Sequence, residues 1–461
     1  MLEADLVILG AGAAGMAAAR TAADNGLSVV LLDEQRQPGG QIYRNVGKAG
    51  AERLKLLGSD YAAGKPLVDA LTHPAITHLA TAIAWQIDVK SGIACSIDGR
   101  ASRVVGRRYL LATGAIERPM PLPGWTLPGV MTAGAAQILL KQSAIVCTDA
   151  VLVGSGPLLY LVAAQMARAG SPPLAIVETQ TRRDLLAAMR HGLGALRGWR
   201  YLAKGIVLLS EVRRAGIKRH VAATDIAIDG KEMAEAVSFT AGGKQYRIEC
   251  STVLLHHGVV PNNSAARSVG ILHEWNRRQR CFVSRRDEWG RTNVAELFVA
   301  GDGSAIGGAN AAVISGRLAA LEIARELGVI SLTERDRKAV SLNASLNCEL
   351  AARPFLDRAY PPFAAAVLPA DGTIICRCEE VTAGEIRRFA GLGCIGPNQA
   401  KAFSRAGMGP CQGRYCGLAV TELLAHANRL TQDETGYYRI RPPLKPVTLG
   451  ELAAIADDTS N

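Results

Sequence analysis

The sequence predicts an α/β protein with two Rossmann-like units, followed by a small, mainly helical domain near the C-terminal end. Two glycine-rich turns, at residues 10–15 and 154–159, each follow an apolar strand and open an apolar helix. Four cysteines in two close pairs mark the third part. With 461 residues, the chain is long enough for two or three domains that each bury a core.

The first unit starts with an apolar strand at residues 6–9, which enters Gly10-Ala-Gly12-Ala-Ala-Gly15. We expect a helix to about residue 25. Gly10 permits the turn, Gly12 lets a pyrophosphate approach the backbone, and Gly15 lets helix and strand pack closely. The first helical turn, with Ala13 and Ala14, offers free N–H groups to phosphate oxygens. These features predict a dinucleotide site.

A second strand, at residues 28–32, follows this helix and closes at an acidic pair. A carboxylate at this point of a Rossmann unit accepts hydrogen bonds from ribose hydroxyls. Asp33 is the first candidate for that role, and Glu34 is the neighbouring alternative.

The second unit repeats the signal in Ala150-Val-Leu-Val-Gly154-Ser-Gly156-Pro-Leu-Leu159, and its next strand, 174–177, ends at Glu178. Leu159 replaces the third glycine and should push helix and strand apart. Glu178 suits a ribose diol and repels a 2′-phosphate, which disfavours NADP. A bound nicotinamide nucleotide, another adenine nucleotide and an empty scaffold are three open alternatives for this unit.

The C-terminal cysteines are arranged as Cys376-Arg-Cys378 and, after 32 intervening residues, Cys411-x4-Cys416. Two glycine-rich loops, joined by a helix at about 382–391, carry them, and the glycine N–H groups at 409, 413 and 417 are candidate donors to sulfur. Zinc sites favour Cys-x2–4-Cys pairs, which a Cys-x-Cys pair fits poorly. Two close pairs supply two thiolates per iron, so the spacing predicts a [2Fe-2S] cluster, with zinc and a lost cluster as alternatives. The other six cysteines are expected to be reduced, buried structural thiols: Cys95, Cys147, Cys250, Cys281, Cys348 and Cys394.

Composition and charge restrict the class of protein. No apolar run approaches the roughly 20 residues of a membrane helix, and the first strand leaves no room for a signal peptide, so we expect a cytoplasmic protein. The net charge is +11, and residues 182–220 form a basic stretch. Because no aromatic platform accompanies that stretch, it predicts a solvated helix face and no nucleic-acid partner. Attraction to an acidic partner, or peripheral association with the anionic inner membrane, is the alternative.

Later segments resemble the flavoproteins with two dinucleotide-binding domains, such as the glutathione and thioredoxin reductases. The matching motifs are Tyr109-Leu-Leu-Ala-Thr113-Gly114, Leu297-Phe-Val-Ala-Gly301-Asp302-Gly303 and Gly307-Gly308-Ala309-Asn310. The resemblance implies FAD, with Asp302 on the ribityl chain and the helix from Ala309 facing the flavin or pyrophosphate. No redox cysteine pair of the disulfide reductases is present in the first two units, so dithiol reduction is not expected.

This resemblance also implies the domain organisation. A discontinuous FAD domain (1–145 and 266–332) encloses the second Rossmann domain (146–265). A helical linker (333–371), a [2Fe-2S] domain (372–430) and an extended tail (431–461) follow. Within the tail, Arg439–Pro446 is rich in proline and basic residues, and we expect it to run extended over the surface, against another subunit or, alternatively, as a free end.

The cysteine segment resembles the bacterioferritin-associated ferredoxin-like [2Fe-2S] domain over residues 372–430. The whole chain resembles the alpha-type subunits of heteromeric amino-acid and opine dehydrogenases, which include those of opine oxidase and of the hydroxyproline and proline dehydrogenases, and the middle subunit of hydrogen cyanide synthase. Four stretches carry this match: Pro38-Gly-Gly40-Gln41-Ile-Tyr43, residues 117–125, residues 406–416 and residues 441–450. Gly40 and Gln41 thereby become candidate cofactor contacts.

In that family, a partner subunit with its own flavin oxidises the C–N bond of an opine, proline, hydroxyproline or similar amino acid. The resemblance implies that this chain relays the electrons to a quinone or other carrier, in some members with an FMN between the subunits and with a small third subunit. We expect no catalytic residue here, and His256 and His257 are interpreted as structural. The alternatives are a self-sufficient NADH-dependent reductase that uses Glu178, and a cluster-storage or scaffold protein.

Overall fold

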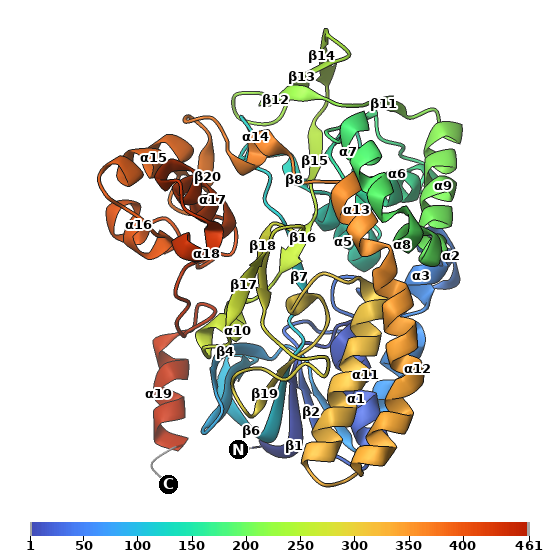
Figure 1. The fold of residues 1–461 in the computed structure, drawn as a ribbon, viewed down its shortest axis with the longest axis vertical. Coiled ribbons are helices and arrows are strands. Elements are labelled where there is room, and N and C mark those ends of the chain that lie inside the picture. Colours follow the sequence, from blue (N-terminus) through green and yellow to red (C-terminus); the bar gives the residue numbers. More distant parts are fainter. Residues whose placement is uncertain (1, 459–461) are drawn as a thin grey trace.

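The apolar N-terminal run forms β1 (Leu2–Leu9), the central strand of a parallel sheet. Leu6, Val7 and Ile8 are fully buried because layers cover both faces of the strand. The computed structural model describes residues 2–458 (Figure 1). The parallel strands follow the order β3 (Ile76–Leu79), β2 (Val29–Leu32), β1, β6 (Arg100–Leu111) and β19 (Leu297–Val299).

Two helices from distant parts of the sequence cover one face of this sheet. These are α1 (Ala13–Asp24) and α11 (Ala309–Glu326), and α12 (Leu332–Ala351) lies outside α11 (Figure 1). A Cβ on Gly316 would lie only 2.2 Å from the backbone oxygen of Ala14, so glycine permits the close approach of α1 and α11. The antiparallel strands β4 (Ile83–Asp88) and β5 (Gly92–Ile97) extend the sheet beyond β6. Short helices connect β2 to β3: η1 (Val46–Lys48), α2 (Ala51–Leu57), α3 (Ser59–Ala62), α4 (Lys65–Asp69) and η2 (Ala70–Thr72).

The second unit has its own parallel sheet, in the order β11 (Lys218–His220), β10 (Ala175–Glu178), β9 (Ala150–Gly154), β15 (Thr252–His256) and β8 (Val130–Thr132). Its helices are α5 (Ala133–Ser143), α6 (Pro157–Arg168), α7 (Arg182–Ala188), η3 (Met189–His191), α8 (Gly192–Arg197) and α9 (Trp199–Arg214). Because β8 pairs with β15, this unit begins at residue 130 and not at the expected residue 146.

Several short strands complete and join the two units. A three-stranded antiparallel sheet projects from the second unit: β12 (Thr224–Asp229), β13 (Ala236–Ala241) and β14 (Lys244–Glu249). The chain crosses between the units on the two-stranded pair β7 (Ala115–Glu117) and β16 (Val259–Pro261). It then re-enters the first unit through α10 (Ser264–Ser268), the hairpin β17 (His273–Asn276) and β18 (Cys281–Ser284), and the turn η4 (Gly301–Gly303).

The remaining residues form the linker, the cysteine domain and the tail. The linker contains α12, α13 (Arg353–Ala359) and α14 (Ala364–Val367). The cysteine domain has the short hairpin β20 (Ile374–Cys376) and β21 (Val381–Thr382), with α15 (Ala383–Gly391), α16 (Pro397–Ser404), α17 (Gly417–Asn428) and α18 (Gln432–Thr435) (Figure 1). The helix α15 begins where Thr382 and Glu385 form a capping box. These features confirm the predicted fold class, two Rossmann-like units and a small helical domain.

The tail differs from its prediction. No helix spans residues 439–446, but α19 (Leu449–Asp458) is helical and contacts β6 of the first unit. Ile455 is buried beside Trp85, and the Leu444 N–H donates to the Trp85 carbonyl at 2.7 Å. The prediction that the whole tail is extended is therefore wrong for Leu449–Asp458, which is helical and packs on its own chain. Within residues 2–458, no helix combines the length and apolar character needed to cross a bilayer.

Candidate cofactor sites

The first glycine turn lies where β1 meets α1, and close contacts explain its glycines. A Cβ on Gly10 would lie 2.5 Å from the Ala112 oxygen, and one on Gly15 would lie 1.9 Å from the Gly10 oxygen. Gly12 is the N-cap of α1, so the first N–H groups of this helix, at Ala13 and Ala14, have no partner within the helix. The turn thus presents backbone donors to an anion.

Two further segments converge on this turn at the carboxyl edge of the sheet. The loop at Gly40 lies directly on it, since a Cβ on Gly40 would be 2.8 Å from the Gly12 Cα, and this loop carries Gln41. A Cβ on Gly301 would likewise lie 2.8 Å from the Cβ of Ala14. The structure therefore brings the predicted residues of the first site together, although they come from distant parts of the sequence.

The other predicted residues of the first site contact one another or their immediate neighbours. A Cβ on Gly303 would lie 2.8 Å from Thr113 Oγ1 and 3.0 Å from the Gly114 nitrogen. Asp302 Oδ1 accepts hydrogen bonds from the Gly307 and Gly308 N–H groups, both at 2.9 Å. These bonds fix the turn that starts α11 at Ala309, so the predicted motifs form one continuous cradle.

The two acidic candidates at the end of β2 have different partners. Asp33 Oδ2 accepts a hydrogen bond from the Ala11 N–H at 2.6 Å, and burial raises the pKa of Asp33. Glu34 instead forms an ion pair with Lys445 of the tail at 2.6 Å. Asp33 thus lies against the nucleotide turn, whereas Glu34 anchors the C-terminal segment.

In the second unit, the carboxylate expected to bind ribose is fully buried and bound by three other side chains. Arg219 contacts Glu178 through Nε at 2.5 Å and Nη2 at 3.0 Å. The Tyr160 hydroxyl donates to Glu178 Oε2 at 3.1 Å, and Gln180 Nε2 donates to the same oxygen at 2.5 Å. Hydrogen bonding to Glu178 raises the pKa of Arg219.

Linker residues after α13 cover the second glycine turn. Ser155 Oγ donates to the Pro361 oxygen at 3.0 Å, and the ring of Tyr360 packs edge-on against Tyr160, with centroids 6.4 Å apart. Leu159, at the position of the third glycine, is buried in the core of this unit. Gly154 and Gly156 therefore lie beneath residues of their own chain.

His256, the last residue of β15, and His257, which follows it, lie in the same region. His256 Nδ1 is 2.6 Å from Glu117 Oε1, and a Cβ on Gly156 would lie 3.2 Å from its Nε2. His257 Nε2 is 2.8 Å from the Pro119 oxygen, and the Phe363 N–H donates to its Nδ1. Both rings are buried and bonded within the fold, which agrees with their interpretation as structural residues.

The four C-terminal cysteines meet as two pairs in the cysteine domain. A thiol hydrogen bond from Cys416 is the main factor that lowers the pKa of Cys376 to about 6, and the backbone N–H groups of 378, 379 and 407 add to it. The thiols of Cys378 and Cys411 are in contact with each other. Within residues 2–458, no three His, Cys, Asp or Glu side chains close around a single ion. Each thiol pair joins one cysteine of the first loop to one of the second, and backbone N–H groups are directed at the sulfur of Cys376.

The glycines around these cysteines make room for side chains. A Cβ on Gly409 would lie 2.3 Å from the Cys378 Cβ, and one on Gly413 would lie 2.4 Å from the Tyr438 ring. The Gly417 N–H donates to the Gly413 oxygen, so it is not a donor to sulfur as expected. Cys348 is exposed, which corrects the prediction that it is buried.

An aromatic row connects the cysteine domain to the first unit. Its successive members are separated by centroid distances of 5.1, 5.7 and 5.7 Å: Trp275, Phe282, Tyr437 and Tyr438. The Tyr438 hydroxyl ends the row 3.7 Å from Cys416 Sγ. The row packs two units that carry different predicted cofactor sites.

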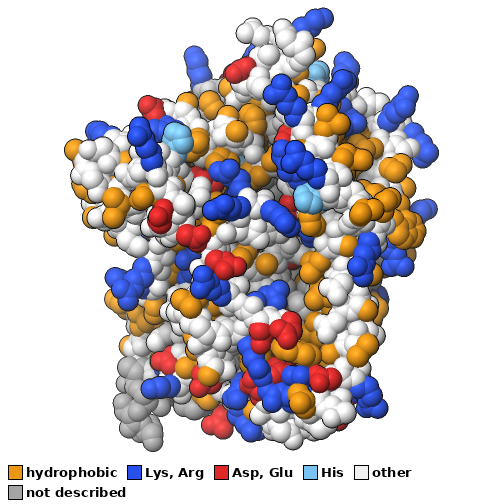
Figure 2. Space-filling model, in the orientation of Figure 1, with side chains coloured by type: hydrophobic (Ala, Val, Ile, Leu, Met, Phe, Trp, Pro, Cys, Tyr) orange, Lys and Arg blue, Asp and Glu red, His pale blue; other side chains and the backbone are white. Residues whose placement is uncertain are grey.

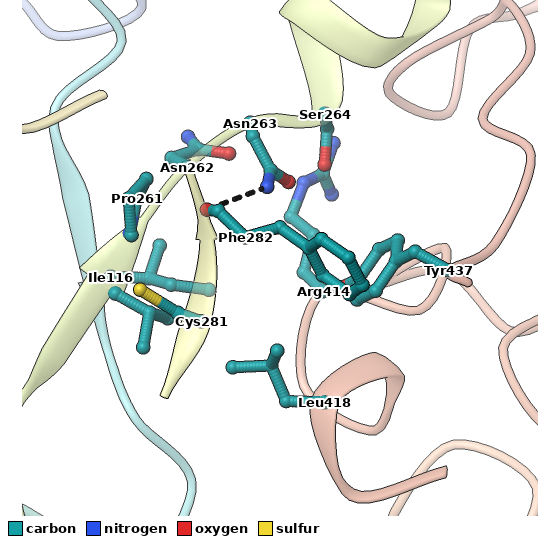
Figure 3. Close-up of a pocket in the computed structure, with 11 residues that line it drawn as sticks. Ile116, Pro261, Asn262, Asn263, Ser264, Cys281, Phe282, Arg414, Leu418 and Tyr437 are labelled. Carbon is teal, nitrogen blue, oxygen red and sulfur yellow. Dashed lines mark hydrogen bonds between the residues drawn. The ribbon is translucent and has the colours of Figure 1, made fainter. Parts of the chain in front are cut away.

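A small, partly open pocket lies beside this row (Figure 3). On one side the pocket is lined by Asn262 and Asn263, which lie between β16 and α10, where the chain returns from the second unit to the first. On the other side it is lined by Arg414 and Leu418 of the cysteine domain. Thr113 Oγ1 of the first site donates to the Asn262 oxygen at 2.7 Å. The pocket thus lies at the junction between the FAD-type cradle and the cysteine loops.

Two side chains that hold the sites together were not anticipated from the sequence. Arg219 gave no signal, because its partner Glu178 is 41 residues away. Lys141 lies in α5 among apolar residues, and a lysine in an apolar helix is a signal that could have indicated a buried, bonded ammonium group. Its Nζ donates to the Gln41 oxygen at 3.1 Å and to Gln137 Oε1 at 2.8 Å, and burial lowers its pKa to about 7.

Comparison with known proteins agrees with this arrangement. The pyridine nucleotide-disulphide oxidoreductase family matches residues 4–316, and the sarcosine oxidase A3 domain matches residues 373–456. The second match runs past residue 430, so it joins the cysteine domain and the tail. The fold is similar to the crystal structure of L-proline dehydrogenase from P. horikoshii, with a TM-score of 0.71 and 18% identity over 98% of this chain and 79% of that chain.

Two relatives match nearly the full length. The A subunit of opine oxidase from Rhizobium meliloti (strain 1021) is 41% identical over 98% of this chain and 99% of its own length. Hydrogen cyanide synthase subunit HcnB of Pseudomonas aeruginosa is 31% identical over 96% of both chains. The chain therefore belongs to the pyridine nucleotide-disulphide oxidoreductase family, and within it to the group that contains the opine oxidase A subunits.

Proposed function

We propose that this chain is the electron-transfer subunit of a heteromeric flavin-dependent oxidoreductase that oxidises the C–N bond of an amino acid or opine. The observation that supports the proposal is one chain in which the unit with the first glycine turn and the domain with the two thiol pairs pack together through the row Trp275 to Tyr438. Full-length similarity to the A subunit of opine oxidase supports the same function. An opine, proline, hydroxyproline or a similar amino acid is the proposed substrate class.

The residues of the chain have separate roles in this proposal. The glycine turn and the N-terminus of α1 bind the pyrophosphate of FAD, Asp33 binds the ribose, and Asp302 fixes the start of α11 beside the flavin. Cys376, Cys378, Cys411 and Cys416 hold a [2Fe-2S] cluster. When bound, FAD and the cluster supply the conversion of a two-electron input into one-electron steps. The aromatic row fills part of the space between the two sites, beside the pocket in Figure 3.

A partner subunit completes the proposed enzyme. Relatives of this chain are named as subunits of opine oxidase, hydrogen cyanide synthase and sarcosine oxidase. We therefore infer a flavin-containing catalytic subunit that binds the substrate, an FMN at its interface with this chain, and a quinone or similar acceptor in the cytoplasm or at the inner membrane. The NADH-dependent alternative is disfavoured, because Glu178 is bound by Arg219 and the linker covers the second turn.

Metal analysis with cysteine variants tests the proposal. The anaerobically isolated complex should contain two iron atoms and two acid-labile sulfides per chain, since a [2Fe-2S] cluster has that composition. C376S and C411S should lose both and retain the flavin. C394S is the matched control, because Cys394 is a buried thiol outside the two pairs. A parent protein without iron and sulfide, or a C411S variant with unchanged electron transfer to an artificial acceptor, would contradict the proposal.

A further inference from the structure

An unusual surface lies on the outer side of the second unit, over α7, α8 and α9. Large apolar side chains are strongly exposed there, including Leu186 at 72%, Leu193 at 86% and Ile206 at 68%. Eight such residues fall within 23 positions of the sequence: Leu185, Leu186, Met189, Leu193, Leu196, Trp199, Ile206 and Val207. We call this group the α7–α9 face. In Figure 2, hydrophobic and basic side chains lie side by side over these helices, at the upper right.

The α7–α9 face is also strongly basic. Residues 182–214 contain seven arginines and one lysine but only two acids, which gives a net charge of +6 (8 − 2) out of +11 for the whole chain. Both acids are already paired, Asp184 with Arg358 at 3.0 Å and Glu211 with Arg168 at 2.5 Å. Lys204 pairs with Asp60. Among the residues that the structure describes, none of the seven arginines forms an ion pair: Arg182, Arg183, Arg190, Arg197, Arg200, Arg213 and Arg214.

The geometry of α9 shows that its outer apolar residues are not needed for its own packing. Leu208 and Val212 are buried against the core of the second unit. Ile206 precedes Leu208 by two positions, or about 200° around a helix, so it points the opposite way. Trp199 is seven positions before Ile206 and shares its side of the helix. The helix thus has a second apolar stripe that faces outward.

We propose that the α7–α9 face docks on an anionic lipid surface. Helices that lie at a membrane interface combine an exposed apolar stripe containing Trp and Leu with Arg or Lys beside it. Clusters of four to eight basic residues on such helices are typical of binding to anionic lipids. A protein interface would bury the same apolar residues, but it is generally depleted in charge at its centre, whereas here the arginines alternate with the apolar residues.

This inference deepens the proposed function, since it rests on that proposal for the identity of the acceptor. Docking through the second unit would hold the enzyme beside a membrane-dissolved quinone without a spanning helix. Binding to lipid is measured in the absence of turnover. Failure of vesicle binding would therefore leave the iron and flavin analysis of the proposed function unaffected, and the two proposals can fail separately.

The test is sedimentation of the purified full-length chain, with its cofactors, on vesicles. Vesicles of phosphatidylcholine with about 30% phosphatidylglycerol would be compared with phosphatidylcholine alone, at low and high salt. We expect binding to the anionic vesicles only, weakened by salt because the attraction is electrostatic. R197E/R200E should reduce the partition coefficient at least about tenfold, as expected from reversing two charges at roughly 1 kcal/mol each or more.

A second pair of variants separates the apolar contribution and supplies a control. W199S/I206S should bind the anionic vesicles several-fold more weakly, because the apolar stripe no longer inserts. K231E/M233S changes one exposed cation and one exposed apolar residue in the loop between β12 and β13, away from the face, and should bind as the parent does. Circular dichroism would show that each variant is folded. Equal binding to neutral and anionic vesicles, or unchanged binding by R197E/R200E, would overturn the proposal, as would loss of a co-purifying protein in W199S/I206S with vesicle binding intact.

Discussion

Arg219 and Glu178 form a two-point ion pair at the carboxyl end of β10, with Arg219 Nη2 3.0 Å from Glu178 Oε2. Glu178 is fully buried, and its oxygens also accept hydrogen bonds from Tyr160 and Gln180. A carboxylate at this position normally binds the ribose of a dinucleotide. In this chain the carboxylate of Glu178 instead bonds to side chains of the second unit. These bonds have consequences for the binding of NADH and for the stability of the protein.

The first consequence concerns NADH. Because a ribose would have to displace Arg219, and the linker at Pro361 covers the glycine turn, NADH should not reduce the flavin of the isolated chain. Anaerobic mixing with excess NADH should leave the visible absorbance band of the flavin unchanged for minutes, whereas dithionite should bleach it. Rapid, stoichiometric bleaching by NADH would restore the reductase alternative.

The second consequence concerns stability. R219A leaves the buried Glu178 without its charged partner and should lower the free energy of unfolding by roughly 1–3 kcal/mol, the cost of an unsatisfied buried group. The Arg219 guanidinium is partly exposed, which keeps the loss below that of a fully buried pair. Urea unfolding measures the change. R247A is a suitable control, because its ion pairs with Asp229 and Glu249 lie at the surface and should contribute about 0–1 kcal/mol.

FAD retention should depend on Gly15. In G15A the new methyl group would meet the Gly10 oxygen at 1.9 Å, so β1 and α1 must separate and the pyrophosphate cradle deforms. We expect purified G15A to contain less than about a tenth of the parent's flavin per chain, since a tenfold loss requires only about 1.4 kcal/mol. G50A is the matched control, because no atom lies within 4 Å of a Cβ at Gly50 and its φ is −67°. Flavin released on denaturation, per mole of protein, decides the outcome.

Lys141 should make stability depend on pH. Burial lowers its pKa in the folded protein to about 7, from about 10.5 in the unfolded chain, so the unfolded chain binds more protons between these values. The contribution of Lys141 therefore opposes folding most strongly below pH 7, and the free energy of unfolding rises as pH increases from 7 to about 10. The slope for one proton is at most about 1.4 kcal/mol per pH unit.

K141M removes this proton and should reduce that slope. The difference in unfolding free energy between K141M and the parent, measured in urea at pH 7, 8 and 9, isolates the contribution of Lys141 from that of tyrosines and cysteines that titrate in the same range. K90M is the control, because Lys90 is exposed near the turn between β4 and β5. Parallel curves for K141M and the parent would show that Lys141 keeps its ordinary pKa.

The sequence was informative where local chemistry determines the structure. Gly10, Gly12 and Gly15 predict a strand, turn and helix because few residues other than glycine fit such contacts, and the cysteine spacing predicts two adjacent pairs. In the structure the glycines form the expected close contacts, whereas the cysteines pair across the two loops, Cys376 with Cys416 and Cys378 with Cys411. The fold class followed from the same local signals, repeated at Gly154 and Gly156.

Features that depend on distant partners were not predictable in this way. From the sequence alone, β8 is assigned to the first unit, and only its pairing with β15 shows that it belongs to the second. The proline-rich sequence of the tail likewise does not predict that the Leu444 N–H bonds to the Trp85 carbonyl. Gly413 was interpreted as a donor near sulfur, yet a Cβ at this position would lie 2.4 Å from the ring of Tyr438, 25 residues later. In each case, a side chain or strand remote in sequence decides the role of the residue.

The ion pair between Lys445 and Glu34 joins residues 411 positions apart in the sequence. Together with the packing of α19 on β6, it means that the sheet containing the nucleotide turn gains some of its contacts only from residues that the ribosome adds late. Stable loading of the flavin should accordingly follow synthesis of the tail. A nascent chain that stalls before this segment would expose Trp85 and the edge of its sheet to the proteases that remove incomplete proteins.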